Sequence, residues 1–315
     1  MHIDLRALPK IRDSWTYLYL EHCKIEQDLK SIAMFDAAGK TPIPCSMLSV
    51  LMLGPGTSIS HAAVKILAEN GCLLAWVGEE GVRYYAQGLG ETRSSQRLLR
   101  QAYLCSNPSL RLAVVKKMYE MRFKEVIPAE WTLQQIRGRE GVRVRDAYSK
   151  ASAETGVEWK GRNYSRNAWS ATDPVNRALS SANSCLYGIC HAAIVAAGYS
   201  PGLGFIHTGK MLSFVYDIAD LYKMEMTVPA AFHAAKSNNK NIEREVRIAC
   251  RDMFRETRLL QRIVDDLNTL MSVGGSFDMG DDPSYDEDAA KPGQLWNGRQ
   301  GAVEGGVSYS DEKEV

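Results

Sequence analysis

Two separated segments carry the side chains that could do metal chemistry. Asp217 and Asp220 stand three residues apart in an otherwise apolar, helix-like stretch, so their carboxylates lie on one face. His207 lies between glycines in the preceding segment 204–210. Two acids in an apolar helix are costly to desolvate unless a positive charge compensates them. A divalent metal ion and an Arg or Lys partner would both compensate, and these residues leave the choice open.

A third segment, residues 137–145, places four arginines around Glu140. The ordinary interpretation is a solvated helix stabilised by ion pairs. The alternative is a phosphate-lined site in which Glu140 is a metal ligand. A His nitrogen combined with carboxylate oxygens suits Mg²⁺ or Mn²⁺ better than a metal that prefers thiolates.

Two further features could bind nucleic acid. Six arginines step by three or four residues along 241–271, so on one unbroken helix they share a face about 27 Å long: Arg244, Arg247, Arg251, Arg255, Arg258 and Arg262. The alternative is a solvated face neutralised by neighbouring acids. Tyr164 and Trp169 alternate with basic residues in 159–169, where they could stack on bases or anchor a loop to the core.

The elements that position these side chains predict an α+β fold with a small β-rich N-terminal domain followed by a larger all-helical catalytic domain. Strand-like segments at 14–20, 32–35 and 47–53, a helix at 58–70, and a hairpin at 72–86 fall in residues 1–90. Helical periodicity then dominates 91–275. We expect helices at 94–106, 108–124, 130–154, 174–197, 212–223, 229–236 and 241–271.

The composition narrows the class of protein. The chain has 315 residues, 45% of them hydrophobic, which excludes a fully disordered chain. Residues 276–315 form an acidic tail of net charge −7, expected to be mobile, and the rest of the chain carries +8, which suits a polyanionic partner. We expect no membrane span and no secretory signal. Seven cysteines without a Cys-x-x-Cys pair favour reduced thiols in the cytoplasm and argue against zinc.

In combination, these segments resemble the CRISPR-associated protein one family, the spacer-acquisition integrase, of the I-E kind. The resemblance runs from about Leu5 to about Met271, and it leaves the tail uncovered. The matching segments are 54–57, 60–64, 76–79, 137–141, 184–188, 204–210, 213–220 and 247–252.

The resemblance implies a homodimer, and two such dimers flanking a central dimer of CRISPR-associated protein two in a heterohexamer. It also implies that Glu140, His207 and Asp220 hold Mg²⁺ or Mn²⁺, with Asp217 as a supporting acid. Double-stranded DNA would be the substrate. The expected DNA-contacting residues are Arg83, Arg139, Tyr164, Trp169, Tyr187, Lys210, Lys223, Arg244, Arg247, Arg251 and His22. His22 stands where the family usually has a tyrosine, and we expect it to stack on the DNA end more weakly and with a dependence on pH.

The implied reaction is transesterification, in which a 3′-hydroxyl of captured DNA attacks a repeat phosphodiester. The site would also cleave or resolve branched DNA. One alternative is a structure-specific endonuclease that uses water as the attacking group, and another is a non-catalytic DNA-holding scaffold.

Overall fold

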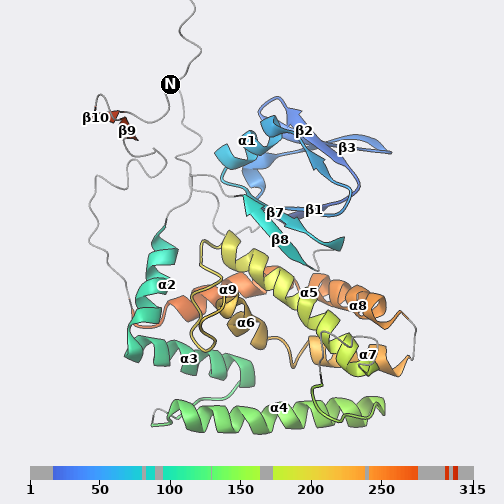
Figure 1. Ribbon diagram of the computed structural model, residues 1–315, viewed down its shortest axis with the longest axis vertical. Helices are drawn as coiled ribbons and strands as arrows, with labels where there is room; N and C mark the ends of the chain where they lie inside the picture. The colour runs from blue at the N-terminus through green and yellow to red at the C-terminus, as the bar shows by residue number, and fades with distance from the viewer. Residues whose placement is uncertain are drawn as a thin grey trace, which may run out of the picture.

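The computed structural model describes residues 17–79, 83–88, 95–128, 130–163, 173–237, 241–275, 295–297 and 301–303. Within them, strands occupy the chain up to residue 88 and helices dominate from 96 to 271 (Figure 1). This confirms the predicted α+β class. The predicted domain limits near residues 90 and 275 border on residues outside the described ranges, and they stay predictions. In the tail, β9 (Leu295–Asn297) pairs with β10 (Gly301–Val303).

The N-terminal part is built from two four-stranded sheets. The first has the order β1 (Tyr17–Leu20), β5 (Val50–Leu53), β7 (Leu73–Val77) and β8 (Tyr84–Gly88), with only β8 antiparallel to its neighbour. The second has the order β4 (Gly39–Ile43), β3 (Ser31–Asp36), β2 (Lys24–Asp28) and β6 (Ser58–Ile59). Helix α1 (His61–Glu69) packs with both sheets around one apolar core.

The first sheet is buried on both faces. Leu51 and Leu74 point into the core shared with α1, while Val50 and Leu73 belong to a second cluster on the opposite face. This explains why β5 is entirely apolar instead of alternating. The second cluster includes Val195 and Ala196, so this face of the sheet rests on the end of a helix from the C-terminal part.

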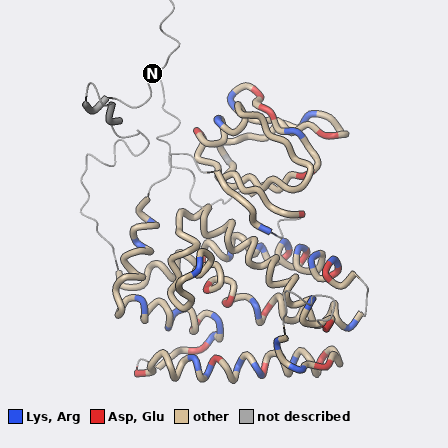
Figure 2. The backbone as a smooth tube through the Cα atoms, in the orientation of Figure 1, with Lys and Arg blue, Asp and Glu red and all other residues tan. Residues whose placement is uncertain are grey.

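That helix, α5 (Pro174–Ala196), is the centre of the helical part (Figure 1). It begins where Asp173 accepts a hydrogen bond from the Asn176 backbone N–H at 2.9 Å, with Pro174 in the first turn. By length and composition it could cross a membrane, but 61% of its most apolar window is buried within the protein. Figure 2 shows it almost free of charged residues, as a helix surrounded by others should be.

The other helices surround α5, and four of them pack directly on it: α6, α7, α8 and α9. Their bounds are α2 (Gln96–Ser106), α3 (Pro108–Phe123), α4 (Leu133–Thr155), α6 (Ser213–Asp220), α7 (Thr227–Lys236), α8 (Ile242–Glu256) and α9 (Leu259–Met271). Most lie within two or three residues of the predicted segments.

One predicted helix is wrong. Residues 241–271 form two helices, α8 and α9, because Arg258 adopts the left-handed conformation with φ of 48°. The apolar pattern explains the break, since α8 buries Val246, Cys250 and Phe254 at intervals of four, whereas α9 starts afresh from Leu259. Consequently the six arginines do not form one continuous track.

The joint at Arg258 makes a stability prediction. A left-handed conformation costs a non-glycine residue roughly 1–2 kcal/mol, and glycine adopts it freely. We expect Arg258→Gly to raise the free energy of unfolding in urea by about 1 kcal/mol relative to Arg258→Ala. Equal stabilities of these two variants would contradict the claim that the backbone at Arg258 is strained.

Candidate active site

The buried carboxylate of Asp217 organises the loop that precedes α6. Its Oδ2 accepts hydrogen bonds from the backbone N–H groups of Phe205 at 2.6 Å and Ile206 at 3.0 Å. Its Oδ1 accepts from the backbone N–H of His207 at 2.8 Å and lies 2.7 Å from the ring Nδ1 of His207. The Asp217 side chain is fully buried, while that of His207 is 43% exposed. Asp217 therefore fixes the His207 ring through Nδ1 and leaves the rest of the imidazole partly exposed to solvent.

This arrangement fixes the chemistry of the imidazole. Because Nδ1 donates to Asp217, the second nitrogen, Nε2, is available as a ligand or proton acceptor when the ring is neutral. No described residue makes a hydrogen bond to Nε2. The hydrogen bond to Asp217 raises the pKa of His207 above its ordinary value of 6.5, and the nearby charge of Asp220 acts in the same direction.

Gly204 lets the loop close around Asp217. A Cβ atom on Gly204 would lie 2.2 Å from the carbonyl oxygen of His207 and 2.8 Å from Cβ of Ser213. Any larger residue would push the His207 segment away from the start of α6. The Ser213 hydroxyl donates to the Lys210 carbonyl at 2.8 Å and closes the other end of the loop.

Asp220, one turn after Asp217, is paired with a lysine. Its Oδ1 lies 2.6 Å from Nζ of Lys223, and both side chains are largely buried. Burial alone would lower the pKa of Lys223, but the Asp220 charge and Tyr187 outweigh it, so the pKa rises and the lysine stays charged. Lys223 also lies over the Tyr187 ring, 4.9 Å from its centroid.

Aromatic rings join this pair to His207. The Tyr216 ring lies 5.1 Å from that of Tyr187 and 5.9 Å from that of His207, and Lys210 approaches its face at 6.0 Å. The structure thus gathers six of the predicted site residues near Tyr216, which the sequence did not single out. These are Tyr187, His207, Lys210, Asp217, Asp220 and Lys223.

Glu140 interacts with two side chains of α3. Its Oε2 accepts a hydrogen bond from the Tyr119 hydroxyl at 2.7 Å, and its Oε1 forms an ion pair with Arg122. Arg122 is itself largely buried, and its Nε has no hydrogen-bond partner in the part of the chain that the structure describes. Burial and the bond to Glu140 raise the pKa of Tyr119, so it stays a donor. Sequence reasoning missed both partners, since neither stands near Glu140 in the chain.

The donor set suits a hard divalent cation, because imidazole nitrogen and carboxylate oxygen are its usual ligands and a carboxylate behind the ring nitrogen is a common support. Among the described residues, however, no group of three or more His, Cys, Asp or Glu side chains is close enough together to hold a metal ion. Asp220 and Glu140 instead each bind a basic side chain. The three-ligand set therefore stays a prediction.

The other predicted DNA contacts are spread over both parts of the protein. Arg244 and Arg251 are exposed on α8 and Arg247 is half-buried there, and Arg251 lies 2.8 Å from the Asp252 carboxylate. Figure 2 shows charges of both signs along this helix. The remaining predicted contacts are Arg83, Arg139 and His22, which are exposed, and Tyr164 and Trp169, which lie outside the described residues.

Comparison with known proteins decides the family. A model described as CRISPR associated protein Cas1 matches residues 122–251. CRISPR-associated endonuclease Cas1 2 of Thermus thermophilus is 54% identical over 309 residues, covering 98% of this chain and 94% of that protein. The chain belongs to the Cas1 family. Cas1 endonuclease of Escherichia coli is 44% identical over 273 residues, with 86% and 89% coverage. The solved structure of a TtCas1–DNA complex has 56% identity and a TM-score of 0.78, covering 84% of this Cas1 chain and 99% of the other.

The pair formed by Asp217 and His207 predicts a pH-dependent stability. Because the folded pKa of His207 is raised, the pair stabilises the fold fully below pH 6.5, and this stabilisation is lost as pH rises through the folded pKa. We expect Asp217→Asn to lower the pKa of His207 measured by NMR titration. We also expect the difference in unfolding free energy between wild type and variant to shrink from about pH 5.5 to about pH 8.5. An unchanged His207 titration would contradict the assignment.

Proposed function

We propose that this Cas1 protein joins the 3′-hydroxyl ends of captured spacer DNA to phosphodiesters of a CRISPR repeat in a metal-dependent transesterification. The observation that carries the proposal is the imidazole of His207. Asp217 fixes it through Nδ1, and it is partly exposed beside Asp220 and two lysines. A rigid imidazole next to an acid and fixed positive charges suits phosphoryl transfer, which depends mainly on positioning and on stabilising developing charge.

The metal is part of the proposal. Mg²⁺ or Mn²⁺ held by Glu140, His207 and Asp220 would polarise the scissile phosphate and stabilise the oxygen that leaves. Binding it requires Asp220 and Glu140 to turn from their basic partners, Lys223 and Arg122, toward the cation. Those two basic side chains would then be available to phosphate oxygens.

The exchange of esters balances without a nucleotide cofactor. One P–O bond forms to the attacking 3′-oxygen and one breaks to the leaving 3′-oxygen. The proton lost by the first hydroxyl is replaced on the second, and no bond to the protein forms. Lys223 keeps its proton, because its pKa is raised, and supplies a fixed positive charge beside the reacting group. Disintegration of branched DNA is the reverse reaction at the same site.

The proposal extends to binding partners. Arginines of α8 would hold DNA phosphates, so affinity should fall with salt concentration. The active assembly would be a homodimer, two copies of which flank a dimer of CRISPR-associated protein two. All seven cysteines are free thiols, which suits a reducing compartment, and we place the protein in the cytoplasm.

A metal-dependent endonuclease acting on branched DNA is the second candidate. It would use the same residues with water as the attacking group, and the relatives' own description as endonucleases favours it. A non-catalytic scaffold is disfavoured because it gives no reason for a fixed imidazole beside an acid.

The attacking group distinguishes the two reactions. With the partner protein, Mn²⁺ and supercoiled repeat DNA, we expect joined products from spacer DNA with 3′-hydroxyl ends and none from the same DNA with 3′-deoxy ends. Gel separation of joined and cleaved strands measures both. Equal cleavage of the repeat with either DNA, and no joining, would favour the endonuclease.

The ligand assignment makes a separate prediction. We expect Glu140→Ala and Asp220→Ala each to abolish joining, by at least about 10²-fold, because each removes a ligand of the proposed metal. Glu154→Ala is the matched control, since Glu154 lies on the same helix as Glu140 and is exposed. Circular dichroism melting should show folded protein in all three. Full joining by either of the first two variants would refute the assignment.

A further inference from the structure

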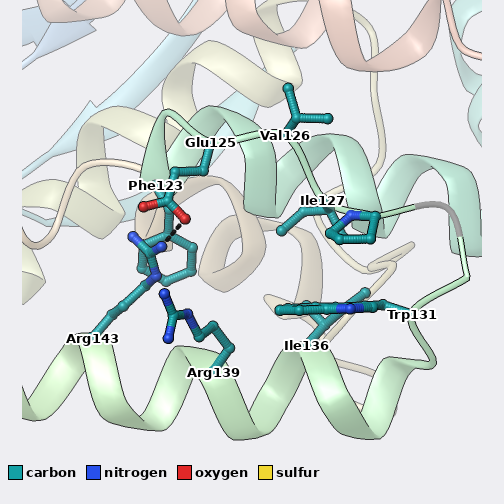
Figure 3. A pocket seen from close by; sticks show the side chains of 9 residues that line it. Phe123, Glu125, Val126, Ile127, Trp131, Ile136, Arg139 and Arg143 are labelled. Carbon is teal, nitrogen blue, oxygen red and sulfur yellow. Dashed lines mark hydrogen bonds and ion pairs between the residues drawn. The ribbon is translucent and has the colours of Figure 1, made fainter.

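A pocket lies between the end of α3, the segment that follows it, and α4 (Figure 3). Its volume is about 150 Å³. Apolar side chains line one side, chiefly Ile127, Trp131 and Ile136, and two arginines of adjacent turns of α4, Arg139 and Arg143, line the other. A cavity of this size holds a single six-membered ring.

The two arginines differ in their partners. Arg143 forms an ion pair with Glu125 and lies over the Phe123 ring, 4.9 Å from its centroid. Arg139 is exposed, and no described residue pairs with it. The pocket therefore offers one uncompensated guanidinium group beside apolar walls, which suits a ligand with a flat ring and an attached anion.

One apolar residue at the pocket is almost uncovered. Val126 lines the pocket and is 87% exposed. The Trp131 indole, which Figure 3 shows reaching into the pocket from the side opposite the arginines, makes no hydrogen bond through its N–H within the described residues. An aromatic side chain of this kind can contact a base, and the contact tolerates sequence changes.

The pocket adjoins Glu140. Arg143 follows Glu140 by three residues, so both lie on the same side of α4. The Phe123 ring contacts an arginine on each side. Its centroid lies 5.2 Å from the guanidinium of Arg122, the partner of Glu140, and 4.9 Å from the guanidinium of Arg143. A strand with one nucleotide in the pocket would therefore pass next to the Glu140 carboxylate.

We infer that this pocket receives one unpaired pyrimidine nucleotide of the DNA substrate, with the ring against Trp131 and Ile127 and the phosphate at Arg139. The inference rests on the proposed function, since it assigns a subsite of the same DNA. A pyrimidine fits because the volume suits one ring better than the two fused rings of a purine.

The test measures binding by fluorescence anisotropy, using duplexes with 3′ tails of thymidines, adenosines or abasic units and with blocked 3′ ends. We expect the wild type to bind the thymidine tail about tenfold more tightly than the abasic tail, and the adenosine tail less tightly than the thymidine tail. Trp131→Ala should remove the preference for thymidine over abasic units without weakening binding of the abasic tail.

Arginine and control variants complete the design. Arg139→Gln should weaken binding of both tails and reduce the slope of log affinity against log salt by about 1, because it removes one phosphate contact. Lys150→Gln, an exposed change elsewhere on α4, should leave the thymidine preference unchanged. A full thymidine preference in folded Trp131→Ala would overturn the inference.

Trp131 packs against the core, so a second variant guards against unfolding of the alanine variant. Trp131→Phe keeps an aromatic wall. We expect the thymidine tail to change tryptophan emission in the wild type, and this change to be lost in Trp131→Phe; the same emission change in both proteins would refute the pocket. The binding test does not depend on the joining assay. A thymidine preference in a protein that does not join DNA would therefore refute the proposed function but would leave the pocket assignment intact.

Discussion

One buried charge sets the geometry of the candidate site. The Asp217 carboxylate lies where water cannot reach it and is stabilised by three backbone N–H groups and the His207 ring. A buried carboxylate without such donors would be very costly, so the loop 205–207 cannot leave it without a large loss of free energy. The position of the imidazole is therefore a consequence of satisfying Asp217.

The rest of the site follows the same rule of local charge balance. Glu140 faces Arg122 and Tyr119, and Asp220 faces Lys223. The donors to Glu140 come from α3 and the donor to Asp220 comes from the turn after α6, so neither acid is left with an unbalanced negative charge. A polyanionic substrate can then approach acids that would otherwise repel it.

The sequence predicted the parts of the fold that local patterns control. The β-to-helix order, the hairpin of β7 and β8 and the central helix α5 all follow from periodicity and turn residues. Strand β2, with charged residues at Lys24 and Glu26, was missed because its place depends on pairing with β3. The break at Arg258 was missed because it follows from the packing of α8 and α9, which a single-helix pattern hides. Arg122 and Tyr119 were missed for the same reason, since only the packing of α3 brings them to Glu140.

The contact between the first sheet and the end of α5 has a mechanical consequence. Val195 and Ala196 touch the sheet, and the helix ends directly after them, where Gly198 adopts a φ of 83°. The loop that carries His207 starts there. The sheet and the loop that carries His207 thus meet at the end of α5, and a rotation of the strands against the helices would be transmitted to the imidazole along fewer than a dozen residues of backbone.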